Sequence, residues 1–139
     1  MNDSEKFKDL KQKMIDENEA KYGEEIRAKY GAQDVEDSIA NLKGLTKEQY
    51  DEAQHKRQMM EETLIAAFNS GDPAGELAQQ ACELHKQWLC AFYPKYSKEY
   101  HIGLGEMYIA DERFRAYYDK LVPDCAEFLR DAIQVFCRL

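Results

Sequence analysis

The sequence predicts an all-α protein, and three observations support this fold class. Apolar residues recur three and four positions apart along most of the chain, which is the spacing of one helix face. Runs of apolar β-branched residues that alternate with polar ones, as strands require, do not occur. The three prolines and most of the seven glycines stand at the ends of the periodic segments. A length of 139 residues fits one domain.

The first third of the chain, residues 1–44, is expected to form a helical arm that is softer than the rest. Its periodic segments predict three helices, at residues 3–20, 23–30 and 34–42. The apolar stripes of these helices are thin and their other faces are densely charged. Such helices are marginal alone, so we expect a mobile arm that becomes ordered only when it docks.

Residues 45–139 are expected to form a body of five helices joined by short links. The first helix begins with a capping box, in which Thr46 and Gln49 exchange hydrogen bonds with each other's backbone, and it ends near Asn69. The starts of the other four helices are marked by Asp72-Pro73, Ser97, Asp111 and Pro123. The apolar stripes of the second and last helices are formed by Leu77, Ala81, Leu84, Trp88 and Phe92, and by Leu129, Ile133 and Phe136.

Charge and cysteine usage restrict the function. The net charge is -8, and acidic residues outnumber basic ones in both halves, so the chain itself is a poor nucleic-acid binder. No apolar stretch reaches the roughly 18 residues that a membrane helix needs, and the start lacks the apolar core of a signal peptide. We therefore expect a cytoplasmic protein that contacts no membrane, with its four cysteines reduced and buried as small hydrophobic residues.

Aromatic residues are concentrated between residues 88 and 118, where more than half of them stand. Such a cluster suits a pocket for a flat or cyclic apolar compound, and it equally suits the filled core of a helical body. Gly103 and Gly105 lie inside one predicted helix, where each costs up to about 1 kcal/mol relative to alanine. Glycine at these positions indicates close approach either of a ligand or of a crossing helix.

Other chemistries lack the residues they need. Cys82 and His85 share a helix face, but two ligands do not make a metal site, and no C-x-x-C pair is present. Glu106 and Glu112 have no nucleophile beside them, so acid-base catalysis is not expected. No phosphate-binding glycine loop occurs. We predict a protein that is not an enzyme and that uses neither a metal nor another cofactor.

The segment Y-S-K-E-Y-H-I-G-L-G-E-M-Y-I-A-D-E-R-F, residues 96–114, resembles the signature segment H-x-x-L-G-E-M-Y-x-x-D-E-R-F of the TipAS antibiotic-recognition domain. Further similarity lies at Glu24–Gly31 and Phe128–Ile133. The resemblance implies a globin-like helical fold without haem. It also implies a cytoplasmic ligand-sensing domain of a MerR-type transcriptional regulator, binding a thiopeptide antibiotic or another hydrophobic drug. Such a regulator contacts DNA through a fused winged helix and dimerises through its linker.

One departure from the family pattern concerns covalent capture. Thiopeptide-binding members carry a cysteine between the histidine and the L-G-E-M-Y run, and its thiol adds to a dehydroamino acid of the drug. Here that position is Gly103, so we expect reversible binding. The ligand-binding residues are predicted to be His85, Trp88, Tyr96, Tyr100, His101, Gly103, Leu104, Met107, Tyr108 and Phe114. The lid residues, which the arm would fold over the ligand, are predicted to be Phe7, Leu10, Met14, Ile26, Val35 and Ile39.

Three alternatives to a drug-sensing domain of a regulator stay open. The chain can be a stand-alone short form that sequesters drugs and has no transcriptional role. It can be a protein-interaction module, in which the aromatic residues are core and the arm docks on another protein. Since the implied fold is that of globins, a haem protein with His85 or His101 as axial ligand is the third alternative.

Overall fold

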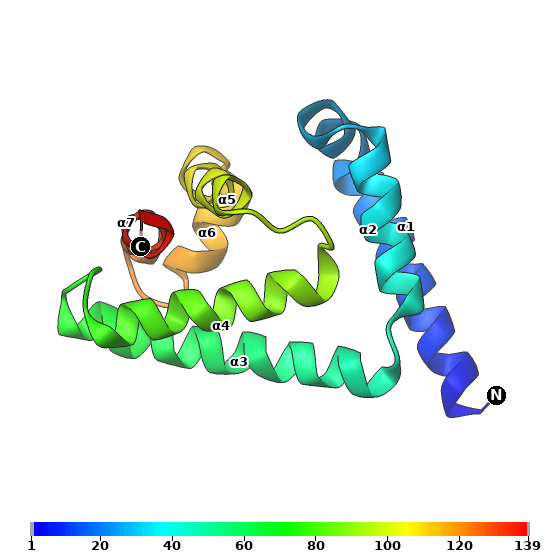
Figure 1. Ribbon diagram of the computed structural model, residues 1–139, viewed down its shortest axis with the longest axis horizontal. Helices are drawn as coiled ribbons and strands as arrows, with labels where there is room; N and C mark the ends of the chain where they lie inside the picture. The colour runs from blue at the N-terminus through cyan, green and yellow to red at the C-terminus, as the bar shows by residue number, and fades with distance from the viewer. Residues whose placement is uncertain (1, 139) are drawn as a thin grey trace. The chain divides into compact units, whose positions relative to one another are not determined.

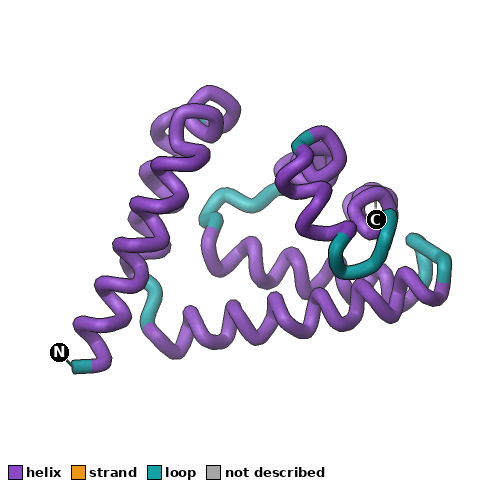
Figure 2. The backbone as a smooth tube through the Cα atoms, turned by 180° about the vertical axis from the view of Figure 1, so that it is seen from behind, coloured by secondary structure: helices purple, strands orange, loops and turns teal. Residues whose placement is uncertain are grey.

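The computed structural model describes residues 2–138 and confirms an all-α chain, with no strand in this range (Figures 1 and 2). Its seven helices are α1 (Asp3–Tyr30), α2 (Ala32–Gly44), α3 (Lys47–Ser70), α4 (Glu76–Phe92), α5 (Lys98–Ala110), α6 (Glu112–Asp119) and α7 (Cys125–Arg138). They form two compact units. One contains the chain up to Glu52 with Cys90–Lys95, and the other contains Ala53–Leu89 with the chain from Tyr96 onward.

In the first unit, α1 is one continuous helix, so the prediction of a separate helix at 23–30 is wrong. The helix bends instead of breaking. In a straight helix Lys11 would lie about 30 Å from Gly31, whereas Lys43 is only about 18 Å from Gly31 along α2. Yet Lys11 Nζ donates to the carbonyl oxygens of Lys43 and Leu45, at 2.7 and 2.9 Å. Only a bent α1 satisfies both, and Figures 1 and 2 show its change of direction.

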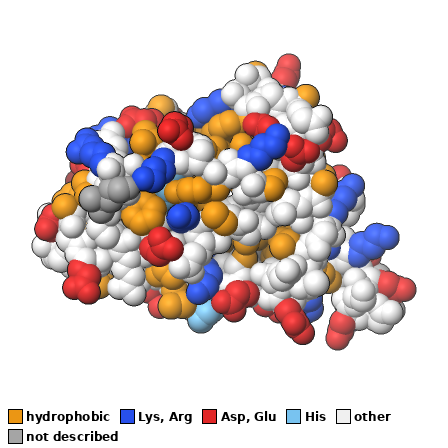
Figure 3. Space-filling view, viewed as in Figure 1, with side chains coloured by type: hydrophobic (Ala, Val, Ile, Leu, Met, Phe, Trp, Pro, Cys, Tyr) orange, Lys and Arg blue, Asp and Glu red, His pale blue; other side chains and the backbone are white. Residues whose placement is uncertain are grey.

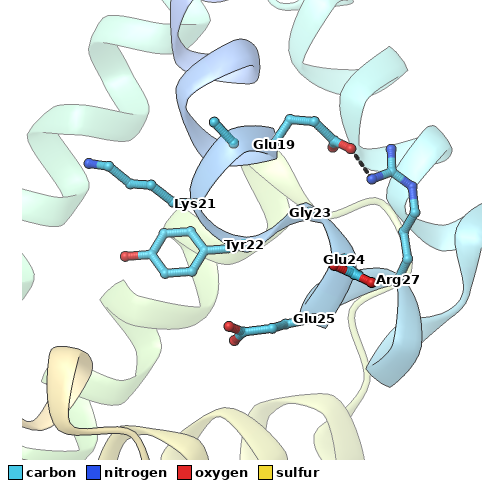
Figure 4. Close-up of a pocket in the computed structure, with 8 residues that line it drawn as sticks. Glu19, Lys21, Tyr22, Gly23, Glu24, Glu25 and Arg27 are labelled. Atoms are coloured by element: carbon cyan, nitrogen blue, oxygen red, sulfur yellow. Dashed lines mark hydrogen bonds and ion pairs between the residues drawn. The ribbon is translucent and has the colours of Figure 1, made fainter.

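The bend occurs around Gly23, which is buried. A Cβ atom at this position would lie 2.6 Å from the carboxyl group of Glu19, so a larger residue would displace that side chain. Glu19 in turn pairs with Arg27 on the far side of Gly23 (Figure 4). Glycine weakens the helix without removing a hydrogen bond, which explains why the chain bends here and stays helical.

The end of α4 belongs to the same unit as α2. Asn41 Nδ2 donates to the carbonyl oxygen of Ala91 at 2.7 Å, and Lys95 Nζ lies 2.8 and 2.9 Å from carboxylate oxygens of Asp34 and Asp37. Tyr50, near the start of α3, contacts the ring of Phe92 edge-on at 6.2 Å between centroids. The capping box is confirmed, with bonds of 3.0 and 3.1 Å between Thr46 and Gln49.

In the second unit, helices α3 to α7 enclose a core whose largest fully buried apolar side chains include Met60, Leu64, Leu129 and Ile133. Helix α5 crosses α7 closely at Gly105. A Cβ atom there would lie 3.4 Å from Ile133 Cδ1 and 3.5 Å from Arg130 Cα. The tight-crossing interpretation is therefore confirmed for Gly105.

The predicted caps hold at α5 and α6 but not at α4 and α7. Ser97 accepts from the backbone N–H of Tyr100 at 3.0 Å, and Asp111 accepts from that of Arg113 at 2.9 Å. Asp72 instead accepts from Ala74 N–H and closes a turn, so α4 begins at Glu76 and not at Pro73. Helix α7 begins at Cys125 and not at Pro123, after Asp124 adopts a positive φ of 68°. Leu77, predicted on the apolar stripe of α4, is 40% exposed, so this part of the predicted stripe is wrong.

Candidate ligand-binding site

Four of the predicted ligand-binding residues form a hydrogen-bonded chain inside the second unit. Tyr96 precedes α5, and its hydroxyl lies 2.7 Å from His101 Nδ1. His101 Nε2, on α5, lies 2.8 Å from Nδ1 of His85 on α4. His85 Nε2 lies 3.1 Å from the hydroxyl of Tyr108, about two helix turns further along α5 than His101. Both histidines are fully buried, so these hydrogen bonds satisfy ring nitrogens that water does not reach.

The hydrogen-bonded chain continues to Arg57, a largely covered arginine that no sequence pattern marked as functional. The hydroxyl of Tyr108 is hydrogen-bonded to that of Tyr118 on α6, whose ring centroid lies 4.7 Å from its own. Arg57 Nη2, on α3, donates to the Tyr118 hydroxyl at 2.9 Å. Arg57 Nε lies 3.5 Å from a carboxylate oxygen of Glu61, which also accepts from the hydroxyl of Tyr117. Helices α3 and α6 thus meet at one guanidinium.

The groups that can only donate fix the direction of the hydrogen bonds between these side chains. A guanidinium only donates, so Tyr118 accepts from Arg57 and its own proton is directed to Tyr108. Tyr108 then donates to His85 Nε2, and His85 donates from Nδ1 to His101 Nε2. The reverse direction would leave the proton of the buried Tyr118 without an acceptor in the chain. We therefore expect both histidines to carry their proton on Nδ1.

Burial keeps these groups in their neutral forms. It lowers the pKa of His101 to about 4, with a smaller contribution from Lys86. It lowers the pKa of His85 well below the ordinary value, and the neighbouring His101 and Arg57 lower it further. Burial also raises the pKa of the Tyr108 hydroxyl. Near neutral pH the hydrogen-bonded chain therefore contains uncharged rings and one cation, Arg57.

The ten predicted ligand-binding residues differ in how far they are buried. Four of them, His85, His101, Leu104 and Tyr108, are buried. The other six are partly exposed, namely Trp88, Tyr96, Tyr100, Gly103, Met107 and Phe114. The rings of His85 and Trp88 are stacked at 6.0 Å, and those of Tyr108 and Phe114 lie 5.9 Å apart. The structure thus brings most of the aromatic members together, and their contact with a ligand stays a prediction.

Gly103 differs from Gly105 although both lie in α5. A Cβ atom at position 103 would have no other side chain or distant backbone atom within 4 Å among the residues that the structure describes. The helix therefore has open space on this side, and a larger residue would fit. No feature of the packing requires glycine here.

The predicted lid residues lie in the first unit and are less buried. Phe7 packs edge-on against Tyr50 at 5.4 Å between ring centroids, and the Tyr50 hydroxyl lies 3.5 Å from Met14 Sδ. Leu10 is 44% exposed, while Ile26, Val35 and Ile39 are partly buried. A separate hollow of about 440 Å³ lies at the bend of α1 (Figure 4). Its lining, from Glu19 to Arg27, is mostly charged and does not resemble a pocket for an apolar compound.

Three of the four cysteines are buried and offer little reactive thiolate, whereas the expectation of burial is wrong for Cys90. Cys82, Cys125 and Cys137 are buried and Cys90 is exposed. Burial raises the pKa of Cys82 and of Cys125 to about 12. Within residues 2–138, no three or more His, Cys, Asp or Glu side chains are grouped to hold a metal ion. None of the helices in this range is long and apolar enough to cross a membrane.

No sequence pattern indicates that this arrangement includes Arg57, Glu61, Tyr117 and Tyr118. The four-residue spacing of Arg57 and Glu61 signals an ion pair on a helix face, but such pairs are usually exposed. Here both side chains are largely covered, at 15% and 22% exposure.

On the face shown in Figure 3, acidic and basic side chains are interspersed and form no continuous basic surface.

The chain is similar to one domain family and to curated transcriptional activators. Residues 22–136 match the TipAS antibiotic-recognition domain family. The chain is 34% identical over 114 residues to the HTH-type transcriptional activator TipA of Streptomyces coelicolor, with 81% of this chain and 45% of the relative covered. It is 26% identical over 137 residues to the HTH-type transcriptional activator mta of Bacillus subtilis, with 99% and 53% covered. The chain spans about half the length of these relatives. No solved structure matches.

Proposed function

Because the chain belongs to the TipAS antibiotic-recognition domain family, we propose that it senses a thiopeptide antibiotic or another hydrophobic drug and binds it reversibly. The observation that carries the reversible mode is Gly103. It occupies the place of the reactive cysteine in thiopeptide-binding members, and it provides no nucleophile. The open space beside it leaves room for a ligand on this side of α5.

The partly exposed aromatic residues support the same site. Trp88 on α4, Tyr100 on α5 and Phe114 on α6 present apolar ring surface, and tyrosine adds a hydroxyl that can orient a bound compound. Of the buried His85–His101 pair, His85 stacks on Trp88 and His101 is hydrogen-bonded to Tyr96, so the pair supports both rings. A rigid polar support under an apolar surface is a suitable base for a small-molecule site.

We propose further that the chain acts as the effector domain of a MerR-type transcriptional regulator. Its curated relatives are HTH-type transcriptional activators about twice as long. The net charge of -8 disfavours direct DNA contact by this chain, so DNA binding would come from a fused winged helix and dimerisation from the linker. A stand-alone drug-sequestering form is the alternative, and the same ligand site would serve it.

Thermal unfolding in the presence of candidate drugs tests ligand sensing. The chain is expected to gain stability from at least one thiopeptide or planar polycyclic drug, by about 2.7 kcal/mol when the free ligand is at 100 times its Kd. Intact-mass measurement after incubation should show the unmodified chain, since binding is reversible. Unchanged unfolding with every compound would reject ligand sensing, and a stable adduct would reject only the reversible mode.

The predicted role of the arm needs its own measurement. If the lid residues order on the ligand, hydrogen exchange of residues 3–42 should slow when a stabilising drug is added. A regulator would use such ordering to alter the linker toward its DNA-binding domain. Equal exchange of residues 3–42 with and without a tight ligand would reject the lid.

A further inference from the structure

The guanidinium of Arg57 has a buried donor without an acceptor. Among residues 2–138, Arg57 Nη1 is shielded from solvent and makes no hydrogen bond. The other nitrogens are engaged, Nη2 with the Tyr118 hydroxyl at 2.9 Å and Nε with Glu61 at 3.5 Å. An unsatisfied buried donor is costly, and it gains most from any acceptor brought to it.

Aromatic faces surround this donor. The guanidinium carbon of Arg57 lies 4.7 Å from the ring centroid of Trp88, 5.3 Å from that of Tyr118 and 5.4 Å from that of Tyr117. Tyr118 is buried, whereas Tyr117 is 47% exposed and lies on the solvent side. Rotation of the Tyr117 side chain would therefore open a route to Nη1 without disturbing the core.

The charge balance indicates which kind of acceptor fits. Glu61 already neutralises Arg57, and the Tyr117 hydroxyl donates to the same carboxylate. A ligand anion would add an unbalanced charge beside Glu61, while a neutral carbonyl oxygen or ring nitrogen supplies only the missing lone pair. The flat face of Trp88 favours a planar compound.

We propose that Arg57 is a specificity-determining residue of the ligand site, where its Nη1 donates to a neutral acceptor on a planar ligand that packs against Trp88. This proposal rests on the proposed ligand-sensing function and names the ligand chemistry that the site selects. Arg57 would then have two roles: its Nη1 binds the ligand, and its Nη2 fixes the direction of the buried hydrogen bonds.

The test compares xanthone, which carries a ring carbonyl, with xanthene, which has a methylene group in its place. Because Trp88 is the only tryptophan, its indole N–H gives a single cross-peak in a nitrogen-proton correlation spectrum, and titration of that peak measures binding beside Arg57. A hydrogen bond from a charged donor predicts at least tenfold tighter binding of xanthone. In Arg57→Met combined with Glu61→Gln, the two compounds should differ less than twofold.

Two further variants separate recognition from folding. Tyr117→Ala should keep the preference for xanthone and bind it at least twofold tighter, which a purely structural role of Arg57 does not predict. Arg115→Met, at a partly exposed arginine of α6, is the matched control and should behave as the unmodified chain. Thermal unfolding of each variant without ligand checks that it is folded.

The outcomes distinguish this proposal from the broader one. Equal binding of the two compounds, a preference that survives in the double variant, weaker binding in Tyr117→Ala, or no response of the Trp88 peak would each overturn the role of Arg57. Ligand sensing would still stand if a thiopeptide stabilises the chain in the thermal assay, and it would fall only if no drug does.

Discussion

The buried pair His85 and His101 should make the domain lose stability as the pH falls below about 6.5. Both histidines are neutral in the folded state because burial lowers their pKa values. In the unfolded chain each has the ordinary value of about 6.5, so acid protonates the unfolded state first. The pair therefore contributes no pH dependence above about 6.5, and stability is lost as the pH drops from there toward the folded pKa.

The magnitude follows from the pKa of His101, which is about 4 when folded. A difference of this size between the folded and unfolded states lowers the free energy of unfolding by about 2 kcal/mol at pH 5 and by about 3 kcal/mol below pH 4. His85 acts in the same direction. Since a small domain has only about 5–15 kcal/mol of stability, the loss is measurable as a shift of roughly 1 M in the urea midpoint.

Urea unfolding at pH 7.5 and pH 5.0 tests this reasoning with two matched variants. His101→Gln removes the buried titrating group, and His55→Gln removes an exposed histidine. His101→Gln should be less stable at pH 7.5, because its partners lose a hydrogen bond, but its stability should fall about 2 kcal/mol less on acidification. His55→Gln should retain the full fall. Carboxylates titrate alike in all three proteins, so an equal fall in His101→Gln and the unmodified chain would refute the reasoning.

Three further substitutions probe separate parts of the structure. Gly103→Cys should fold normally, because its Cβ meets open space. Its thiolate should add to the β-carbon of a dehydroalanine in a thiopeptide while the α-carbon takes up a proton, which forms a thioether. The intact mass should then rise by the whole ligand, and an unmodified variant would contradict this placement of the drug. Ile133→Ala should cost about 2–5 kcal/mol in urea unfolding because Ile133 is fully buried, whereas the exposed Leu77→Ala should cost less than about 1 kcal/mol, and equal losses would refute the core assignment. Thr46→Ala should cost about 1 kcal/mol by the same assay through loss of the capping box, and no loss would show that this cap does not support α3.

The sequence could predict the helix class and several boundaries because these depend on near neighbours. A serine, threonine or aspartate that caps a helix bonds to a backbone group two or three residues away, as Thr46, Ser97 and Asp111 do. The same local chemistry misled the prediction at Asp72 and Pro73. There the aspartate closes a turn and the proline lies within it, and both arrangements are common for an Asp-Pro pair.

The remaining features depend on residues far apart in the chain. The bend of α1 is revealed only by the contact of Lys11 with the end of α2, more than thirty residues later. Likewise, Arg57 becomes a largely covered cation because Trp88 and Tyr118 come to lie against it from other helices. Periodicity can place Arg57 only on a helix face, because it contains no information on which side chains meet across helices.

The two glycines of α5 separate what the fold requires from what it does not. At Gly105 the backbone of α7 approaches so closely that an added Cβ would press on Ile133 and Arg130, so helix packing accounts for the residue. At Gly103 no atom stands in the way, and a glycine inside a helix costs about 1 kcal/mol relative to alanine. Gly103 therefore destabilises α5, and the packing of the helices does not explain why glycine stands there. A ligand that approaches α5 on this side would account for the missing side chain, since glycine leaves the helix backbone accessible.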